Sequence, residues 1–343
     1  SAGVAFNTYS AAGSDAAGYI SQADGLAHGV LSRDLPLART LSWPSAASDP
    51  TWTFSPLGYR PGSAPGTLVP TYPLGLPLLM AGAINLAPSH LRPLAPFLVV
   101  PALAACGVYW TFLLGARLHS RTAGLLAAVM LATSPIFLFQ SVQPMSDVAA
   151  TASWLLAVLL GISTSPLAPL FAGLASGLAL LTRPNLAPVV FAVAWLLRPR
   201  NARSLACYTV GLAPAVAVLA WLQWRLYGTP LSSGYGELGQ LFAWSAIGPN
   251  LVGYAMRMLQ SERAMLVVAA ASAMVLLLRR SLAPSHLRSL APPAMAAMAV
   301  AVVTVACYLP YAVFAEWFYL RFLLPAFPAL LVLVGAQIGR AHV

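Results

Sequence analysis

The sequence predicts an all-α polytopic membrane protein, and three observations lead to this fold class. Apolar residues make up 59% of the 343 residues, whereas charged residues make up 8%. Apolar runs long enough to cross a bilayer recur along the chain. The net charge of +10 comes from arginine alone, because the sequence contains no lysine. This composition excludes a soluble globular domain, and arginines scattered between apolar runs favour positive-inside topology and lipid contacts over nucleic-acid binding.

The first 72 residues are polar and rich in Ser, Gly and Pro, and we expect them to form an extracytoplasmic loop with short helices. Long ordered loops in compact proteins are usually functional. The stretch 14–29 is expected to form a short amphipathic helix. Its 3.6-residue spacing places Asp15, Tyr19, Gln22 and Ala23 on one face.

The segment 72–87 is apolar but short, and Pro73, Gly75 and Pro77 interrupt it. At about 1.5 Å per residue it barely spans a hydrocarbon core of roughly 30 Å. We therefore expect 73–90 to be an interfacial or re-entrant juxtamembrane helix. A full span here would invert every later segment and place the multi-arginine loops outside, against the positive-inside rule.

The segment 73–336 is expected to form a transmembrane bundle of about nine spans. The predicted helices are 94–116, 122–141, 148–164, 167–182, 186–197, 204–224, 264–278, 291–313 and 322–336. A long outer loop, 227–261, follows the sixth of these. The resulting topology gathers all eight carboxylates on the outer side, namely Asp15, Asp24, Asp34, Asp49, Asp147, Glu237, Glu262 and Glu316.

The cysteines, the two ends of the chain and a repeated heptapeptide support no functional prediction. Cys106, Cys207 and Cys307 are isolated in apolar runs and form neither a disulfide framework nor a metal motif. We expect a further helix to precede Ser1 in the natural protein. Residues 337–343 resemble a translated sequencing adapter. The heptapeptide Leu-Ala-Pro-Ser-His-Leu-Arg occurs at both 86–92 and 282–288, on opposite sides in the predicted topology, and we have no physical explanation for it.

Asp15 and Asp147 are the candidate catalytic residues. Two acids brought to one membrane surface from distant positions could deprotonate a hydroxyl group. For each there is a plain structural alternative that is equally good: solvation in a polar loop for Asp15, and capping of a helix N-terminus for Asp147.

Five arginines near the outer helix ends could bind a phosphate group at the bilayer surface, because the guanidinium fork matches phosphate geometry. The five are Arg183, Arg225, Arg257, Arg263 and Arg321. For some of them, ion pairing with glutamates or extension of the side chain to the membrane interface is an equally good explanation. The histidines form no metal cluster, and neither a phosphate-binding glycine loop nor a hydrolase motif is present.

Several short motifs of the chain are characteristic. The run Gly13–Tyr19 (GSDAAGY) resembles the first periplasmic loop of GT-C glycosyltransferases, and more narrowly that of the RgtA/B/C/D-like and dolichyl-phosphate-mannose mannosyltransferase-like group. Pro70–Pro77 resembles the juxtamembrane helix of that group, and Gln143–Asp147 lies where the family has its second acidic loop. Leu181–Asn185 and Arg321–Pro325 also match the family pattern. The sequence departs from the pattern at Ala16, where many relatives carry a second acid.

The resemblance implies a bundle of the GT-C type and a transferase in the bacterial inner membrane whose active site faces the periplasm. It would move a sugar from a polyprenyl-phosphate donor to a hydroxyl on a lipid, glycan or protein. Asp15 would be the general base, assisted by Asp147. Arg183 and Arg321, then Arg225 and Arg263, are the candidates for the donor phosphate. Loop residues that could contact sugar or acceptor are Tyr19, Tyr59, Arg60, Tyr72, Tyr235 and Glu237.

No cofactor is expected, since no ligand set for a divalent cation is visible in the sequence. The expected partners are the lipid-linked donor, the acceptor and membrane lipids, and no nucleic acid. The main alternative is a flippase or transporter of a lipid-linked precursor, which would favour charged residues at mid-membrane and inverted repeats. A non-catalytic membrane scaffold, with 1–72 as a docking surface, is a third hypothesis.

Overall fold

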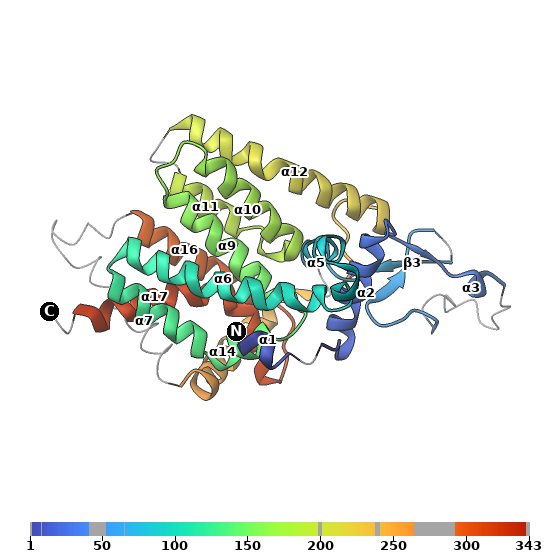
Figure 1. Ribbon diagram of the computed structural model, residues 1–343, viewed down its shortest axis with the longest axis horizontal. Coiled ribbons are helices and arrows are strands. Elements are labelled where there is room, and N and C mark those ends of the chain that lie inside the picture. Colours follow the sequence, from blue (N-terminus) through green and yellow to red (C-terminus); the bar gives the residue numbers. More distant parts are fainter. Residues whose placement is uncertain are drawn as a thin grey trace.

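The computed structural model describes residues 2–7, 9–40, 53–64, 66–197, 201–236, 241–263 and 292–340. The described helices form a bundle with a smaller, mixed region at one end. In Figure 1 the bundle fills the left and centre of the view, and α2, β3 and α3 lie to the right. We call this end of the bundle the site end.

The mixed region at the site end contains two helices, α2 (Gly13–Ala27) and α3 (Pro36–Thr40), and a small sheet. The short helix α1 (Ala2–Ala5) contacts α6 (Ala95–Leu118) instead. The predicted amphipathic helix is thus confirmed as α2. The sheet was not predicted; its antiparallel strands, in the order β1-β3-β2, are β1 (Arg33–Asp34), β2 (Tyr59–Pro61) and β3 (Thr67–Pro70). Strands this short are weak sequence signals, because the period-2 pattern needs several residues to emerge.

The bundle follows the predicted helices closely over most of the described chain. The α-helices are α5 (Gly75–Leu86), α6 (Ala95–Leu118), α7 (Arg121–Thr133), α8 (Pro135–Ser141), α9 (Ser146–Ile162), α10 (Ala168–Thr182), α11 (Val189–Leu197), α12 (Ala202–Tyr227), α14 (Ile247–Ser261), α16 (Pro292–Tyr308) and α17 (Phe327–Arg340). Short 3₁₀ helices are η1 (Ser89–Leu91), η2 (Pro184–Leu186), η3 (Trp244–Ala246) and η5 (Trp317–Ala326). The predicted helix 264–278 and the second heptapeptide copy lie outside the described residues.

The single helix predicted over 122–141 is wrong, because it breaks into α7 and α8 with a bend of 65°. Pro135 causes the break: its ring carries no N–H and collides with the carbonyl of a preceding helical turn. Ser134 starts the new helix by accepting a hydrogen bond from the N–H of Phe137.

The predicted loop 227–261 is also wrong in part, since it contains the four-turn helix α14. Its buried residues are Asn250, Tyr254 and Arg257, whereas apolar residues such as Leu251 and Met256 are exposed. This polarity is the reverse of that of a helix in a water-soluble protein. A polar inner face hid the helix from the sequence pattern.

Three described helices are long and apolar enough to cross a membrane, or four if the bent pair α7–α8 forms one span. The three are Ala95–Leu118, Ala202–Tyr227 and Trp317–Ala336. At 12 residues, α5 is too short to cross, in keeping with the expected interfacial helix. The count of about nine spans and the boundary at residue 72 stay predictions. The helix α17 extends to Arg340, into the segment 337–343 that resembles a translated sequencing adapter.

The core of the bundle surrounds α9, in which 14 of 17 residues are buried, among them Trp154. On one side α10 packs between α9 and α12. Glycines let α10 and α12 approach closely, because a Cβ at Gly173 or Gly211 would collide with the backbone of the facing helix. This packing fixes the first turn of α9 beside the last turn of α10, where Asp147 and Arg183 lie.

Candidate functional site

A cavity of about 580 Å³ opens at the site end, between α2, the end of α10, the last turns of α12 and the segment after α16. Its walls are mostly apolar and aromatic. The charged residues among those that line it are Asp15, Arg183 and Arg321. Three segments far apart in the sequence therefore bring one carboxylate and two guanidinium groups to the same space.

Asp15 lies in the first turn of α2, where the helix dipole favours a negative charge. The hydroxyl of Tyr72 donates a hydrogen bond to its Oδ1 at 2.8 Å, and Nη2 of Arg321 lies 2.9 Å from its Oδ2. The Asp15 side chain keeps 35% exposure toward the cavity. The carboxylate is thus held in place and still reachable by a ligand.

The Tyr72 ring is fixed by close packing against α2. It lies 4.9 Å from the Tyr19 ring, measured between centroids, and 5.9 Å from the Tyr235 ring. A Cβ at Gly18 would collide with the Tyr72 ring, so only glycine permits this approach. Tyr72 therefore presents its hydroxyl to Asp15 in a defined direction.

Asp147 occupies the first turn of α9 and is almost fully buried, with 1% side-chain exposure. Its Oδ1 accepts a hydrogen bond from Nη2 of Arg183 at 2.6 Å, and its Oδ2 lies 3.9 Å from Nε of Arg321. Asp147 is not among the residues that line the cavity. It lies behind the two arginines and balances their charge.

Arg321 links the two acids that the sequence analysis singled out. The same guanidinium contacts Asp15 through Nη2 and Asp147 through Nε. Since those two nitrogens are about 2.3 Å apart in the rigid, planar group, the carboxylate oxygens are at most about 9 Å apart. The two acids were expected to lie close together, and they do so through an arginine that both contact.

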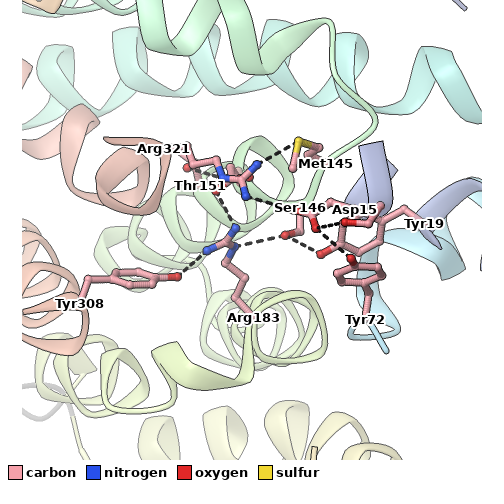
Figure 2. A network of polar contacts seen from close by, with 11 residues as sticks. Asp15, Tyr19, Tyr72, Met145, Ser146, Thr151, Arg183, Tyr308 and Arg321 are labelled. Atoms are coloured by element: carbon pink, nitrogen blue, oxygen red, sulfur yellow. Dashed lines mark hydrogen bonds and ion pairs between the residues drawn. The ribbon is translucent and has the colours of Figure 1, made fainter. Parts of the chain in front are cut away.

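Ser146 connects α2, α9 and α10 at the same point, as Figure 2 shows. Its Oγ accepts a hydrogen bond from the Tyr19 hydroxyl at 2.9 Å and another from Nε of Arg183 at 3.2 Å. Nη1 of Arg183 donates to the Tyr308 hydroxyl at 2.6 Å. Burial raises the pKa of Tyr19 to about 12, so its phenol stays protonated and remains a donor to Ser146.

Aromatic residues from the segment after α16 form the wall beside the arginines. Tyr308 and Phe322 stack with centroids 5.0 Å apart, and the Arg183 guanidinium lies over the Phe322 ring at 5.2 Å. The amide of Asn250 in α14 holds this segment by donating to the carbonyls of Leu309 and Tyr311. This wall was not predicted, although a run of aromatic residues after an apolar helix is typical of a membrane interface.

Comparison with solved structures gives one informative match. The structure of ArnT from Cupriavidus metallidurans bound to undecaprenyl phosphate superposes with a TM-score of 0.54 at 14% identity. The match covers 79% of this chain and 50% of the ArnT chain, so this chain spans about half of ArnT's length. ArnT has a GT-C membrane fold.

This protein has the GT-C fold. The fold class predicted from the sequence is thereby confirmed, as an all-α membrane bundle with a long first loop and a juxtamembrane helix. At 14% identity the likeness concerns the fold alone. Neither a protein-family model nor a curated protein matches the sequence.

Within this GT-C fold, the other predicted site residues have four different outcomes. Tyr59 and Tyr235 line the cavity. Arg60 instead donates to the carbonyls of Ser233 and Gly234, which fixes the loop that carries Tyr235. Two further arginines, Arg225 and Arg263, are exposed and are not among the lining residues, and Glu237 lies outside the described residues.

No group of three or more potential metal ligands occurs among the residues that the structure describes. The chemistry open to these residues is of two kinds. A partly exposed carboxylate can accept a proton from a hydroxyl group. Two guanidinium groups with several tyrosine hydroxyls can hold an anion, and the aromatic faces can pack against a sugar ring or an aliphatic chain.

Proposed function

We propose that this protein is a membrane glycosyltransferase that uses a polyprenyl-phosphate-linked sugar and a hydroxyl acceptor. One observation supports this most directly: Arg321 is shared between a cavity-facing carboxylate and a buried one, next to a second arginine. A general base and an anion site in contact are what such a transfer needs. The solved ArnT structure contains undecaprenyl phosphate, which agrees with a lipid phosphate as the ligand class.

In the proposed reaction, Asp15 accepts the proton of the acceptor hydroxyl as its oxygen bonds to the anomeric carbon of the sugar. The bond from that carbon to the phosphate oxygen breaks, and its electron pair stays on the phosphate. The leaving phosphate gains one negative charge while Asp15 loses one. A phosphate leaves without a strong general acid, so the main requirements are a base and cationic stabilisation.

Arg321 couples these two charge changes. Before transfer it is paired with Asp15 at 2.9 Å. Once Asp15 is protonated this ion pair is lost, and the guanidinium is free to bind the phosphate oxygen that has gained charge. Asp147 keeps Arg183 and Arg321 oriented throughout, as a positioning residue rather than a second base. This modifies the expectation that Asp147 takes part in proton transfer.

The finer assignments also belong to this proposal. The sequence motifs support a specificity like that of the RgtA/B/C/D-like and dolichyl-phosphate-mannose mannosyltransferase-like group, with a hexose or pentose as the transferred sugar. The family resemblance supports localisation in the bacterial inner membrane, and the arginine-rich loops support a cavity that faces the periplasm. Arg183 and Arg321 are the proposed phosphate ligands.

The test measures sugar transfer, or donor hydrolysis, in membranes that contain the full-length protein and radiolabelled polyprenyl-phosphate sugars. Asp15→Asn is expected to lower the rate about 10²- to 10⁴-fold, because it removes the base. Asp24→Asn is the matched control, since Asp24 lies on the same helix but is exposed, with 61% side-chain exposure. It should leave the rate unchanged.

Equal turnover in the wild type and Asp15→Asn would refute the catalytic assignment. No turnover with any donor, together with measurable movement of the lipid between leaflets, would favour the flippase instead.

A further inference from the structure

One wall of the cavity is a single face of α2 whose chemistry changes along the helix. Asp15, Tyr19, Gln22 and Leu26 all line the cavity, at spacings of four, three and four residues. The order is a carboxylate, a phenol, an amide and then an aliphatic side chain. With a rise of about 1.5 Å per residue, Leu26 lies roughly 16 Å along the helix from Asp15.

The last turns of α12 form another wall, which is mostly aliphatic where α2 becomes aliphatic, although Gln223 and Tyr227 of α12 also line it. Leu219, Leu222 and Leu226 line the cavity at spacings of three and four residues, so they share one helical face. Val30 and Leu31, which follow α2, line the same end. We call this part of the cavity the aliphatic groove.

The groove opens outward near the end of α12. Leu231 lines the cavity and is 84% exposed, and Val30 is 42% exposed. Apolar side chains exposed at the mouth of a cavity fit an apolar ligand better than a fully hydrated one.

Gln22 supplies an independent sign of a ligand between the two ends. The residue is only 5% exposed, and within the described part of the chain its Oε1 has no hydrogen-bond partner. A buried carbonyl oxygen without a donor is costly, so such atoms usually have a partner. Gln22 lies about two helical turns from Asp15, roughly 10 Å along the axis. A hydroxyl or amide group of a ligand that reaches Asp15 can donate to it.

We propose that the acceptor is an amphiphile that lies along α2. Its reacting hydroxyl is at Asp15, its polar head donates a hydrogen bond to Gln22, and its aliphatic chain occupies the groove between α2 and α12. This inference rests on the proposed function and narrows its acceptor from lipid, glycan or protein to a lipid-anchored hydroxyl. The donor phosphate binds at Arg183 and Arg321, which line the same cavity.

The experiment uses an octyl β-glucoside with a photoreactive diazirine on its last carbon, and the full-length protein in lipid nanodiscs. After irradiation, the labelled residues are mapped by mass spectrometry. We expect label in 26–31 and 219–231. Label confined to outward-facing residues such as Val210 and Val216 would identify annular lipid contact only and overturn the proposal.

Chain length provides a second measurement on the unmodified protein. Butyl, hexyl and octyl glucosides are compared as competitors of the photolabel. Each added methylene should strengthen competition about three- to fourfold, because burial of one CH₂ changes the affinity by that factor. Equal competition by glucose and by all three glycosides would contradict an aliphatic subsite.

Two variants with a matched control locate the subsites. Leu219→Trp should block the groove and reduce labelling at least tenfold, since it adds bulk to a half-buried wall residue. Val218→Trp adds the same bulk one residue earlier, at an exposed position that does not line the cavity, and should leave labelling unchanged. Gln22→Met removes the acceptor atom at similar volume and should weaken competition about fivefold or more.

These readouts separate failure of the acceptor site from failure of the function. Groove labelling without transfer from any donor would leave the amphiphile site intact and refute the transferase. Transfer to acceptors at a kcat/KM that does not depend on chain length would support the transferase and refute the groove.

Discussion

At the scale of single residues, the two candidate acids differ in what surrounds them. Asp15 faces the cavity with 35% side-chain exposure, whereas Asp147 has 1% and contacts both arginines from behind. A buried charge tolerates the loss of its partner poorly, because the remaining charge cannot be solvated. The acids should therefore respond differently to removal of charge.

Asp147→Asn is expected to destabilise the protein by about 3 to 5 kcal/mol, since it leaves Arg183 without its closest carboxylate. Asp15→Asn should cost far less, because its side chain is partly solvated and Arg321 retains Asp147. The measurement is the thermal unfolding midpoint of each purified variant in the same detergent. Similar midpoints for the two variants would rule out the positioning role of Asp147.

At the scale of elements, the junction of α7 and α8 depends on a carboxylate from α14. Oε1 of Glu262 accepts a hydrogen bond from Ser134 Oγ at 2.9 Å and another from the N–H of Ile136 at 3.2 Å. Burial raises the pKa of Glu262, and these two hydrogen bonds oppose the change only in part. The broken helix and the peripheral helix are thus joined by a carboxyl group that holds its proton to a higher pH than an exposed glutamate does.

This junction makes stability depend on pH in a definite direction. The folded protein holds the Glu262 proton to a higher pH than the unfolded chain, whose glutamates titrate near about 4.3. The contribution of Glu262 to stability is thus fully present below that pH and is lost as the pH rises through the folded pKa. Glu262→Gln stays neutral, so its unfolding midpoint should exceed that of the wild type near neutral pH, with the difference shrinking toward pH 4.

Thermal unfolding of the wild type and Glu262→Gln across pH 4 to 8 gives this comparison. Glu316→Gln, at an exposed position, is the control and should follow the wild type. A Glu262→Gln midpoint that is lower than the wild type by the same amount at every pH would show that the weaker acceptor strength of the amide oxygen matters more than the burial of a charge.

At the scale of the whole molecule, hydropathy and loop charge predicted most helices of the bundle, but not the break between α7 and α8 or the helix α14. The same information could not select among the arginines. Arg225 and Arg263 were as good candidates by sequence position as Arg183 and Arg321, but both are exposed and neither is among the residues that line the cavity. Which arginines meet Asp15 is decided by packing between distant segments.

The candidate site, like the bundle, was predicted in part from the sequence. The periodicity of 14–29 correctly grouped Asp15, Tyr19 and Gln22 on one face of α2. The burial of Asp147 could not be predicted, because the local sequence around a carboxylate at the start of a helix is the same whether the side chain faces solvent or two guanidinium groups. The run of aromatic residues was visible in the sequence, but its place beside the arginines depends on α14, whose polar side faces the protein and which was not predicted.

The orientation of the molecule in the membrane is a prediction for the whole chain. The cavity lies at the Ser146 end of α9, and Ser165 is exposed just beyond the other end. With the three native cysteines replaced by alanine, Asp24→Cys should react with a membrane-impermeant maleimide in intact cells. Ser165→Cys should react only after the cells are permeabilised. The opposite pattern would place the cavity in the cytoplasm.

The central claim is that Arg321 exchanges Asp15 for the leaving phosphate, and the most direct test is the affinity for polyprenyl monophosphate without a sugar. Binding is measured to the wild type, Asp15→Asn and Arg321→Gln in nanodiscs, with Arg225→Gln as the control at an exposed position. We predict that Asp15→Asn, although inactive in transfer, binds the phosphate at least tenfold more tightly than the wild type, because its Arg321 is no longer paired with a carboxylate. Arg321→Gln should bind at least tenfold more weakly, and Arg225→Gln as the wild type does. Unchanged or weaker binding by Asp15→Asn would contradict the exchange.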